Sequence, residues 1–103
     1  MTGEVLILIK FKAAKRALIL ELELVMDVIV DDENTVYETV RLEREELDSA
    51  VIDLVPSTQG IVCVTSFSVD DVIGFIIADK QNKNAYGIGF IDYDNQSQFV
   101  KLS

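Results

Sequence analysis

Histidine is absent from this chain of 103 residues, and cysteine and proline occur once each. Without an imidazole, the chain cannot use histidine as a general acid or base, build a histidine triad, or bind a metal through histidine. The single cysteine, Cys63, cannot form an internal disulfide, which is typical of a reducing compartment. Because Cys63 stands in the apolar run 61–64, we expect a buried structural thiol. We predict neither a cofactor nor a metal.

Positive charge is scarce, since nine Lys and Arg residues stand against eighteen Asp and Glu residues, for a net charge of −9. The imbalance lies after residue 30, because residues 1–30 hold four cations and four acids. Residues 27–53 hold ten carboxylates and two cations, Arg41 and Arg44, a local net charge of −8. The carboxylates are those of Asp27, Asp31, Asp32, Glu33, Glu38, Glu43, Glu45, Glu46, Asp48 and Asp53. Apolar residues are interleaved with these acids, so the segment is expected to fold. Such a surface suggests a partner that carries positive charge, and DNA-binding proteins are the commonest of these.

The sequence also lacks a long uninterrupted hydrophobic run. Residues 5–9 are apolar, but an acid precedes them and cations follow, the reverse of a secretory signal. The apolar stretch 17–30 is interrupted by Glu21, Glu23 and Asp27, so it is too short and too charged to span a bilayer. We expect a soluble, cytoplasmic protein that does not bind a membrane.

Half of the residues are hydrophobic, and no linker or repeat divides the chain, which predicts one domain over residues 1–103. Residues 12–30 have helical spacing, although residues 20–24 alternate like a strand; we expect a helix over about 13–30. A second helix is predicted over 43–54, ended by Pro56. Strands are predicted at 35–42, 60–67, 72–79, 85–93 and 98–102, with residues 1–11 as a strand or an irregular extension. The expected fold class is α+β, a roughly five-stranded antiparallel sheet with two helices covering one face.

Two carboxylates in the strand–helix unit admit two interpretations. Glu38 lies on an extended strand and Glu46 lies at the start of the next helix. In the first interpretation these are ordinary surface acids, and Glu46 suits the positive end of the helix dipole. In the second they imitate the phosphates of a nucleic acid, because residues on one face of a strand repeat about every 6.6–6.8 Å. Pattern alone leaves both open.

Four pieces of this region have a family resemblance. The strand carries Tyr37-Glu38-Thr39-Val40, and Glu45-Glu46-Leu47-Asp48 follows at the start of the helix. Residues 61–67 come next, and residues 87–95 and 99–102 form a C-terminal hairpin pattern. In this order and spacing, over about residues 24–103, the chain resembles the phage-type uracil-DNA glycosylase inhibitors, which are DNA mimics that counter a base excision repair enzyme. Residues 1–16 have no counterpart and form an extension of unknown role.

The resemblance implies a role for individual side chains. Glu38 would lead into the DNA-binding cleft of the glycosylase, Tyr37 and Thr39 would make flanking hydrogen bonds, and Glu46 would be a second phosphate mimic. An apolar pocket between helix and sheet would receive the leucine that the glycosylase inserts into DNA; ordinary core is the alternative for these apolar positions. The implied partner-binding residues are Tyr37, Glu38, Thr39, Val40, Leu42, Glu46, Leu47, Ala50, Val51, Cys63, Gly74, Ile76 and Gly89. Arg41 and Arg44 are expected to bring unfavourable positive charge towards this surface.

On this interpretation the protein is not an enzyme. It would form a 1:1 heterodimer with a uracil-DNA glycosylase and would not itself bind nucleic acid. Three alternatives remain open: an acidic mimic or immunity-type protein that neutralises a different DNA-binding enzyme, a small enzyme with paired carboxylates, and an oligomerisation domain that uses the apolar N-terminal segment.

Overall fold

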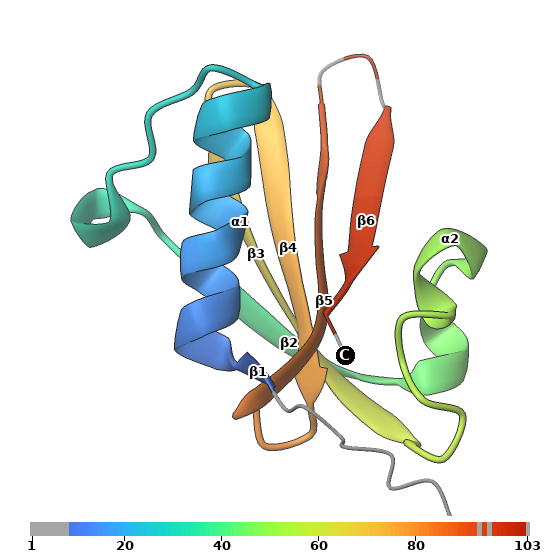
Figure 1. The fold of residues 1–103 in the computed structure, drawn as a ribbon. Coiled ribbons are helices and arrows are strands. Elements are labelled where there is room, and N and C mark those ends of the chain that lie inside the picture. The colour runs from blue at the N-terminus through green and yellow to red at the C-terminus, as the bar shows by residue number, and fades with distance from the viewer. Residues whose placement is uncertain (1–8, 93, 95, 103) are drawn as a thin grey trace, which may run out of the picture.

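The computed structural model describes residues 9–92, 94 and 96–102, which form an α+β fold as predicted (Figure 1). The helices are α1 (Phe11–Val25) and α2 (Ser49–Ile52), with short 3-10 helices η1 (Asp32–Asn34) and η2 (Arg44–Glu46). The strands are β1 (Ile9–Lys10), β2 (Glu38–Glu43), β3 (Ile61–Val69), β4 (Val72–Asp79), β5 (Asn84–Ile91) and β6 (Ser97–Lys101). The expected extension over residues 1–11 lies outside the described residues for 1–8, and residues 9 and 10 form β1.

All strand pairs of the described sheet are antiparallel, in the order β1-β5-β4-β3-β2. β6 also pairs with β5, and it shares one edge of that strand with the two-residue β1. The sheet therefore has six strands, where the sequence predicted about five. β2 forms the opposite edge and pairs only with β3 within the described part of the chain.

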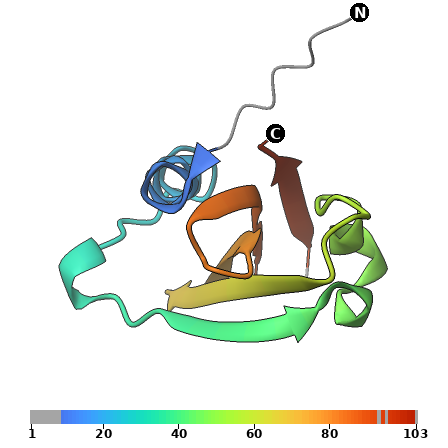
Figure 2. The same cartoon turned by 90° about the horizontal axis from the view of Figure 1, so that it is seen from below.

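The two helices pack on opposite faces of the sheet, which corrects the prediction that both cover one face (Figure 2). Successive side chains of a strand point to opposite faces. Accordingly, Ile76 packs in the core beneath α1, and its neighbour Ile77 packs in a second core with Leu54 and Val55, the residues that follow α2. We call these two sides the α1 face and the α2 face.

The first helix ends at Val25, five residues before the predicted end. Asp27 has a φ of 53°, in the left-handed region that does not continue a right-handed helix. Beyond it, Val28 and Val30 are buried while Ile29 is 85% exposed. This alternation is that of an extended segment, and it places Val28 and Val30 in the core under α1.

The predicted helix 43–54 is broken into η2 and the four-residue α2. Between them, Leu47 and Asp48 are extended, with ψ angles of 145° and 149°. The Asp48 carboxylate accepts a hydrogen bond of 2.9 Å from the Ala50 N–H, as an N-cap residue does. Both pieces are helical, as the residue spacing predicted, but Asp48 caps the start of a separate helix at Ser49.

The strand predicted over 35–42 begins three residues later, as β2, and the other four predicted strands lie within two residues of their predicted bounds. β4 matches its predicted range. Within the described residues, no helix is both long enough and apolar enough to cross a membrane.

Candidate protein-binding site

The edge strand β2 divides its side chains between the two faces. Glu38, Val40 and Leu42 stand opposite Ser66, Val64 and Val62 of β3. Directly paired residues of an antiparallel sheet share a face. Because Val62 and Val64 pack in the core beside α2, Glu38, Val40 and Leu42 point to the α2 face.

An apolar pocket of about 300 Å³ opens on the α2 face between the α2 segment and the sheet. Most of its surface is hydrocarbon, and Glu46 and Asp48 stand at its polar rim. The lining residues are Leu42, Glu46, Leu47, Asp48, Ala50, Val51, Val64, Phe75, Ile77, Ile91, Ser97 and Phe99. In Figure 1, the α2 segment lies on the β6 side of the sheet, away from α1.

Small residues leave this space open. Ala50 contributes only a methyl group to the α2 wall. On the opposite wall, a Cβ added to Gly89 would collide with the Phe99 ring. Glycine at position 89 therefore lets Phe99 lie against the sheet, where its ring centroid is 6.2 Å from that of Phe75. The two rings form the floor and wall of the pocket, because both residues line it.

Five of the predicted partner-binding residues meet at this pocket: Leu42, Glu46, Leu47, Ala50 and Val51. Cys63, Gly74 and Ile76, which were expected in the pocket, do not line it. Cys63 pairs with Arg41 and Ala78 in the register of the sheet, and Gly74 and Ile76 lie beneath α1. Strand alternation is the physical reason, since all three belong to the α1 face. Gly89 accommodates Phe99 and is likewise no lining residue.

The sequence prediction missed Val64, Phe75, Ile77, Ile91 and Phe99. Val64 lies on the α2 face because it pairs with Val40 of β2. Phe75 and Ile77 needed the register between β3 and β4, which pairs them with Ser66 and Val64. Such pairing between distant segments is not visible in a local pattern.

Tyr37 and Thr39 turn towards the α1 side and bond within the chain. The Tyr37 hydroxyl donates to the Asp32 carboxylate, and the Tyr37 ring lies 5.2 Å from that of Phe67. Lys15 completes this group, with its Nζ 3.2 Å from Asp32 Oδ1 and 5.0 Å from the centre of the Tyr37 ring. The Thr39 hydroxyl hydrogen-bonds that of Thr65 at 2.8 Å.

The titration of this group reflects these contacts. The hydrogen bond from Tyr37, and then Lys15, hold the pKa of the Asp32 carboxyl below its usual value. Burial, and then the hydrogen bond to Asp32, raise the pKa of the Tyr37 hydroxyl. The negative charge of Asp32 is therefore balanced by the Lys15 ammonium group and stabilised by the Tyr37 hydroxyl.

The acids near the pocket are not neutralised in this way. Glu43, Glu45 and Glu46 lie together around η2, and the hydrogen bond with Glu45, followed by repulsion from Glu45 and Glu46, raises the pKa of the Glu43 carboxyl. Within the described residues the only ion pair is that of Lys15 and Asp32. Glu38 is exposed and borders a second, more polar hollow of about 400 Å³ with Val36 and Ser68. This region is a surface of concentrated, uncompensated negative charge.

Neither arginine of the acidic segment lines the pocket. The Arg44 guanidinium donates to the carbonyl oxygens of Ile52 and Val55 at 3.1–3.2 Å and so ties η2 to the end of α2. Arg41 points to the α1 face and donates to the Lys80 carbonyl at 3.0 Å. Arg44 therefore supports the wall of the pocket.

Cys63 is buried, as predicted, and its thiol lies 3.5 Å from the Lys80 carbonyl oxygen. In the described part of the chain, no cluster of three or more carboxylate, thiol or imidazole groups could hold a metal ion.

Comparison with known proteins gives no further guide, because no family model, no curated protein and no solved structure matches this chain. The case for a function therefore rests on the residues and on their geometry.

Proposed function

We propose that this chain inhibits a uracil-DNA glycosylase by mimicking DNA, with the pocket on the α2 face receiving an apolar side chain of the enzyme. The observation that carries the proposal is an open apolar pocket beside an edge strand and a 3-10 helix that together carry Glu38, Glu43, Glu45 and Glu46. The family resemblance placed Leu42, Leu47, Ala50 and Val51 around a pocket of this kind, and these four residues lie together there.

The pocket has room for a leucine side chain. An apolar cavity of about 150 Å³ is enough to bind benzene, and this one measures about 300 Å³. Burial of a leucine is worth roughly 1.5–3 kcal/mol, and this contribution does not depend on salt. The pocket would therefore supply the lasting part of the affinity.

The acids would supply the speed and orientation of binding. A net charge of −9 attracts a basic DNA-binding cleft at long range and raises the association rate. Glu38 on β2 and Glu46 at the pocket rim would take the places of phosphates. Binding of this type needs no catalytic group, so the protein would act as a 1:1 protein inhibitor in the cytoplasm, without cofactor and without direct contact to nucleic acid.

A uracil-excision assay tests the proposal. A bacterial uracil-DNA glycosylase is incubated with a uracil-containing oligonucleotide and increasing amounts of this protein. We expect stoichiometric inhibition that persists at moderate salt. Ala50→Phe should raise the inhibitory concentration roughly ten- to hundredfold, because the new ring fills the space that the leucine would occupy.

Ser49→Phe is the matched control. Ser49 is the exposed neighbour of Ala50 on the same short helix and does not line the pocket. It should leave the inhibitory concentration within about threefold of the wild-type value. Equal effects of the two changes would contradict the role of the pocket. Absence of inhibition by a folded wild-type sample in large excess would reject the glycosylase as target and favour another DNA-binding enzyme.

A further inference from the structure

The outer side of α1 has an apolar stripe that the fold leaves uncovered. Ala14, Leu18 and Leu22 are fully buried against the sheet. On the solvent side, Leu20 is 55% exposed and Leu24 is 74% exposed. Since residues of an α-helix are about 100° apart around the axis, Ala13 and Ala17 lie on the same solvent-facing stripe as these two leucines. Figure 2 shows α1 at the outside of the molecule, away from the α2 segment.

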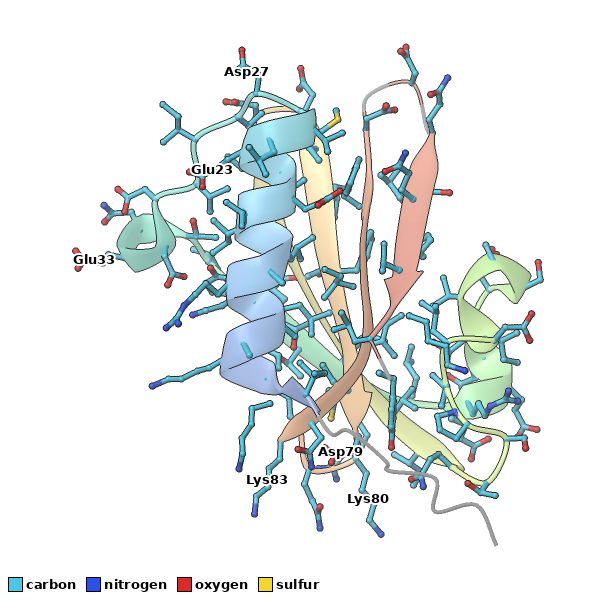
Figure 3. All side chains as sticks on the ribbon, viewed as in Figure 1. Glu23, Asp27, Glu33, Asp79, Lys80 and Lys83 are labelled. Carbon is cyan, nitrogen blue, oxygen red and sulfur yellow. The ribbon has the colours of Figure 1, made fainter. Side chains whose placement is uncertain are left out.

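The charges on this side run against the helix dipole. Lys12 and Arg16 lie in the N-terminal half of α1, where the dipole is positive. Glu23 lies in the last turn and Asp27 just beyond it, where the dipole is negative (Figure 3). Among the described residues, none of the four makes an ion pair. Within one molecule this arrangement is unfavourable.

The same charges are self-complementary about one point of the helix. Arg16 and Glu23 are equally far along the sequence from the midpoint between Ile19 and Leu20, and so are Lys12 and Asp27. A second α1 packed antiparallel about this midpoint brings each cation beside an acid of the other copy. Such a two-fold contact uses the same surface on both subunits.

We propose that two copies of this chain associate through the outer side of α1, antiparallel, with Leu20 near the two-fold axis. Ala13 and Ala17 allow the helices to approach, and the opposed dipoles favour the antiparallel direction. A uniformly cationic partner lying along the helix would be repelled by Lys12 and Arg16, and a uniformly anionic one by Glu23 and Asp27. A second, antiparallel copy of α1 places opposite charges beside each other at both ends of the helix.

The association is independent of the proposed function, because α1 and the pocket lie on opposite faces. A contact over one helix of about 22 Å is small for a protein interface, so the dimer should depend on concentration. Each copy would keep its own pocket free for a partner.

Sedimentation equilibrium of the full chain tests the inference over about 10 µM to 1 mM, the range in which small interfaces associate. The mean mass should rise from 11.5 kDa towards twice that value as the concentration increases. Leu20→Lys should abolish the rise, whereas Ile61→Lys should not. Ile61 is a suitable control because it is 42% exposed and lies on β3.

Charge exchange tests the antiparallel register. Arg16→Glu alone and Glu23→Arg alone place like charges opposite each other and should each weaken association about tenfold. The double exchange restores opposite charges across the axis and should recover it. A wild-type chain that stays at 11.5 kDa throughout would overturn the inference, as would association that persists in Leu20→Lys or a double exchange that does not recover. Circular dichroism confirms that each variant is folded.

Discussion

The two faces of the sheet differ in how completely they are filled. The α1 face is covered by a helix of fifteen residues whose inner side chains are fully buried. The α2 face is covered by a helix of four residues, and Leu47 and Val51 are only partly buried around an open pocket. A short helix cannot seal a sheet of this width. The α1 face is thus closely packed, whereas the α2 face retains an open apolar pocket.

The same contrast holds for charge. On the α1 side, the Lys15 ammonium group balances the negative charge of Asp32, and the Tyr37 hydroxyl donates a hydrogen bond to its carboxylate. Around η2, Glu43 and its neighbouring acids repel one another. A protein selected only for stability would avoid such repulsion, and a surface that meets a basic partner uses it.

The largest expected effect is a difference in the free energy of unfolding between a substitution on the α1 face and one on the α2 face. Leu22→Ala removes a fully buried side chain beneath α1 and should lower the free energy of unfolding by about 2–5 kcal/mol. Leu47→Ala removes a partly buried side chain at a pocket that is already open, so we expect a loss below about 1.5 kcal/mol. Urea unfolding followed by circular dichroism measures both. Equal losses would mean that the two faces are equally filled.

A smaller effect is expected from the acids of the α2 face. Changing both Glu38 and Glu46 to Gln should slow association with the glycosylase about tenfold at low salt, and less at high salt, because exposed charges are screened. Changing Glu33 to Gln and Asp71 to Asn also removes two exposed acids, neither of which lines the pocket, and serves as the control for a change in net charge alone. Stopped-flow mixing at two salt concentrations gives the rates. Equal rates for the two double variants would show that only total charge matters.

The smallest effect concerns pH, and it has opposite signs at Glu43 and at Asp32. The raised pKa of Glu43 means that its ionisation destabilises the fold as pH rises from about 4.5 through the folded-state pKa. Glu43→Gln should therefore raise the thermal midpoint slightly at pH 7 and leave it unchanged well below pH 4. Thermal unfolding at both pH values measures the difference.

Asp32→Asn provides the opposite case. The lowered pKa of Asp32 stabilises the fold above about pH 3.8, and this contribution is lost as pH falls through the folded-state pKa. The thermal midpoint of Asp32→Asn should be below that of the wild type at pH 7. A shift of the same sign in both variants at pH 7 would contradict the contrast between the paired Asp32 and the crowded Glu43.

Much of the fold could be predicted from local patterns. Alternation and β-branched residues located the main strands, and β4 was placed over its whole length, residues 72–79. The helix ends were missed because single residues decided them. The left-handed backbone at Asp27 ended α1, and the Asp48 side chain capped a new helix within an apparently continuous one.

The candidate site was predicted in part for a similar reason. Leu42, Leu47, Ala50 and Val51 come from one short segment of chain, and the resemblance located them together. Cys63, Gly74 and Ile76 were expected at the pocket but lie on the α1 face, because assigning a face to a strand residue requires the register with its neighbours.

The sequence alone determined the excess of negative charge, the absence of histidine chemistry and the α+β class, since these follow from composition and local periodicity. Only the tertiary structure decided that the two helices lie on opposite faces and that Phe75 and Phe99 line the pocket. Local pattern specifies which residues of a strand share a face, but packing and strand register specify what that face meets.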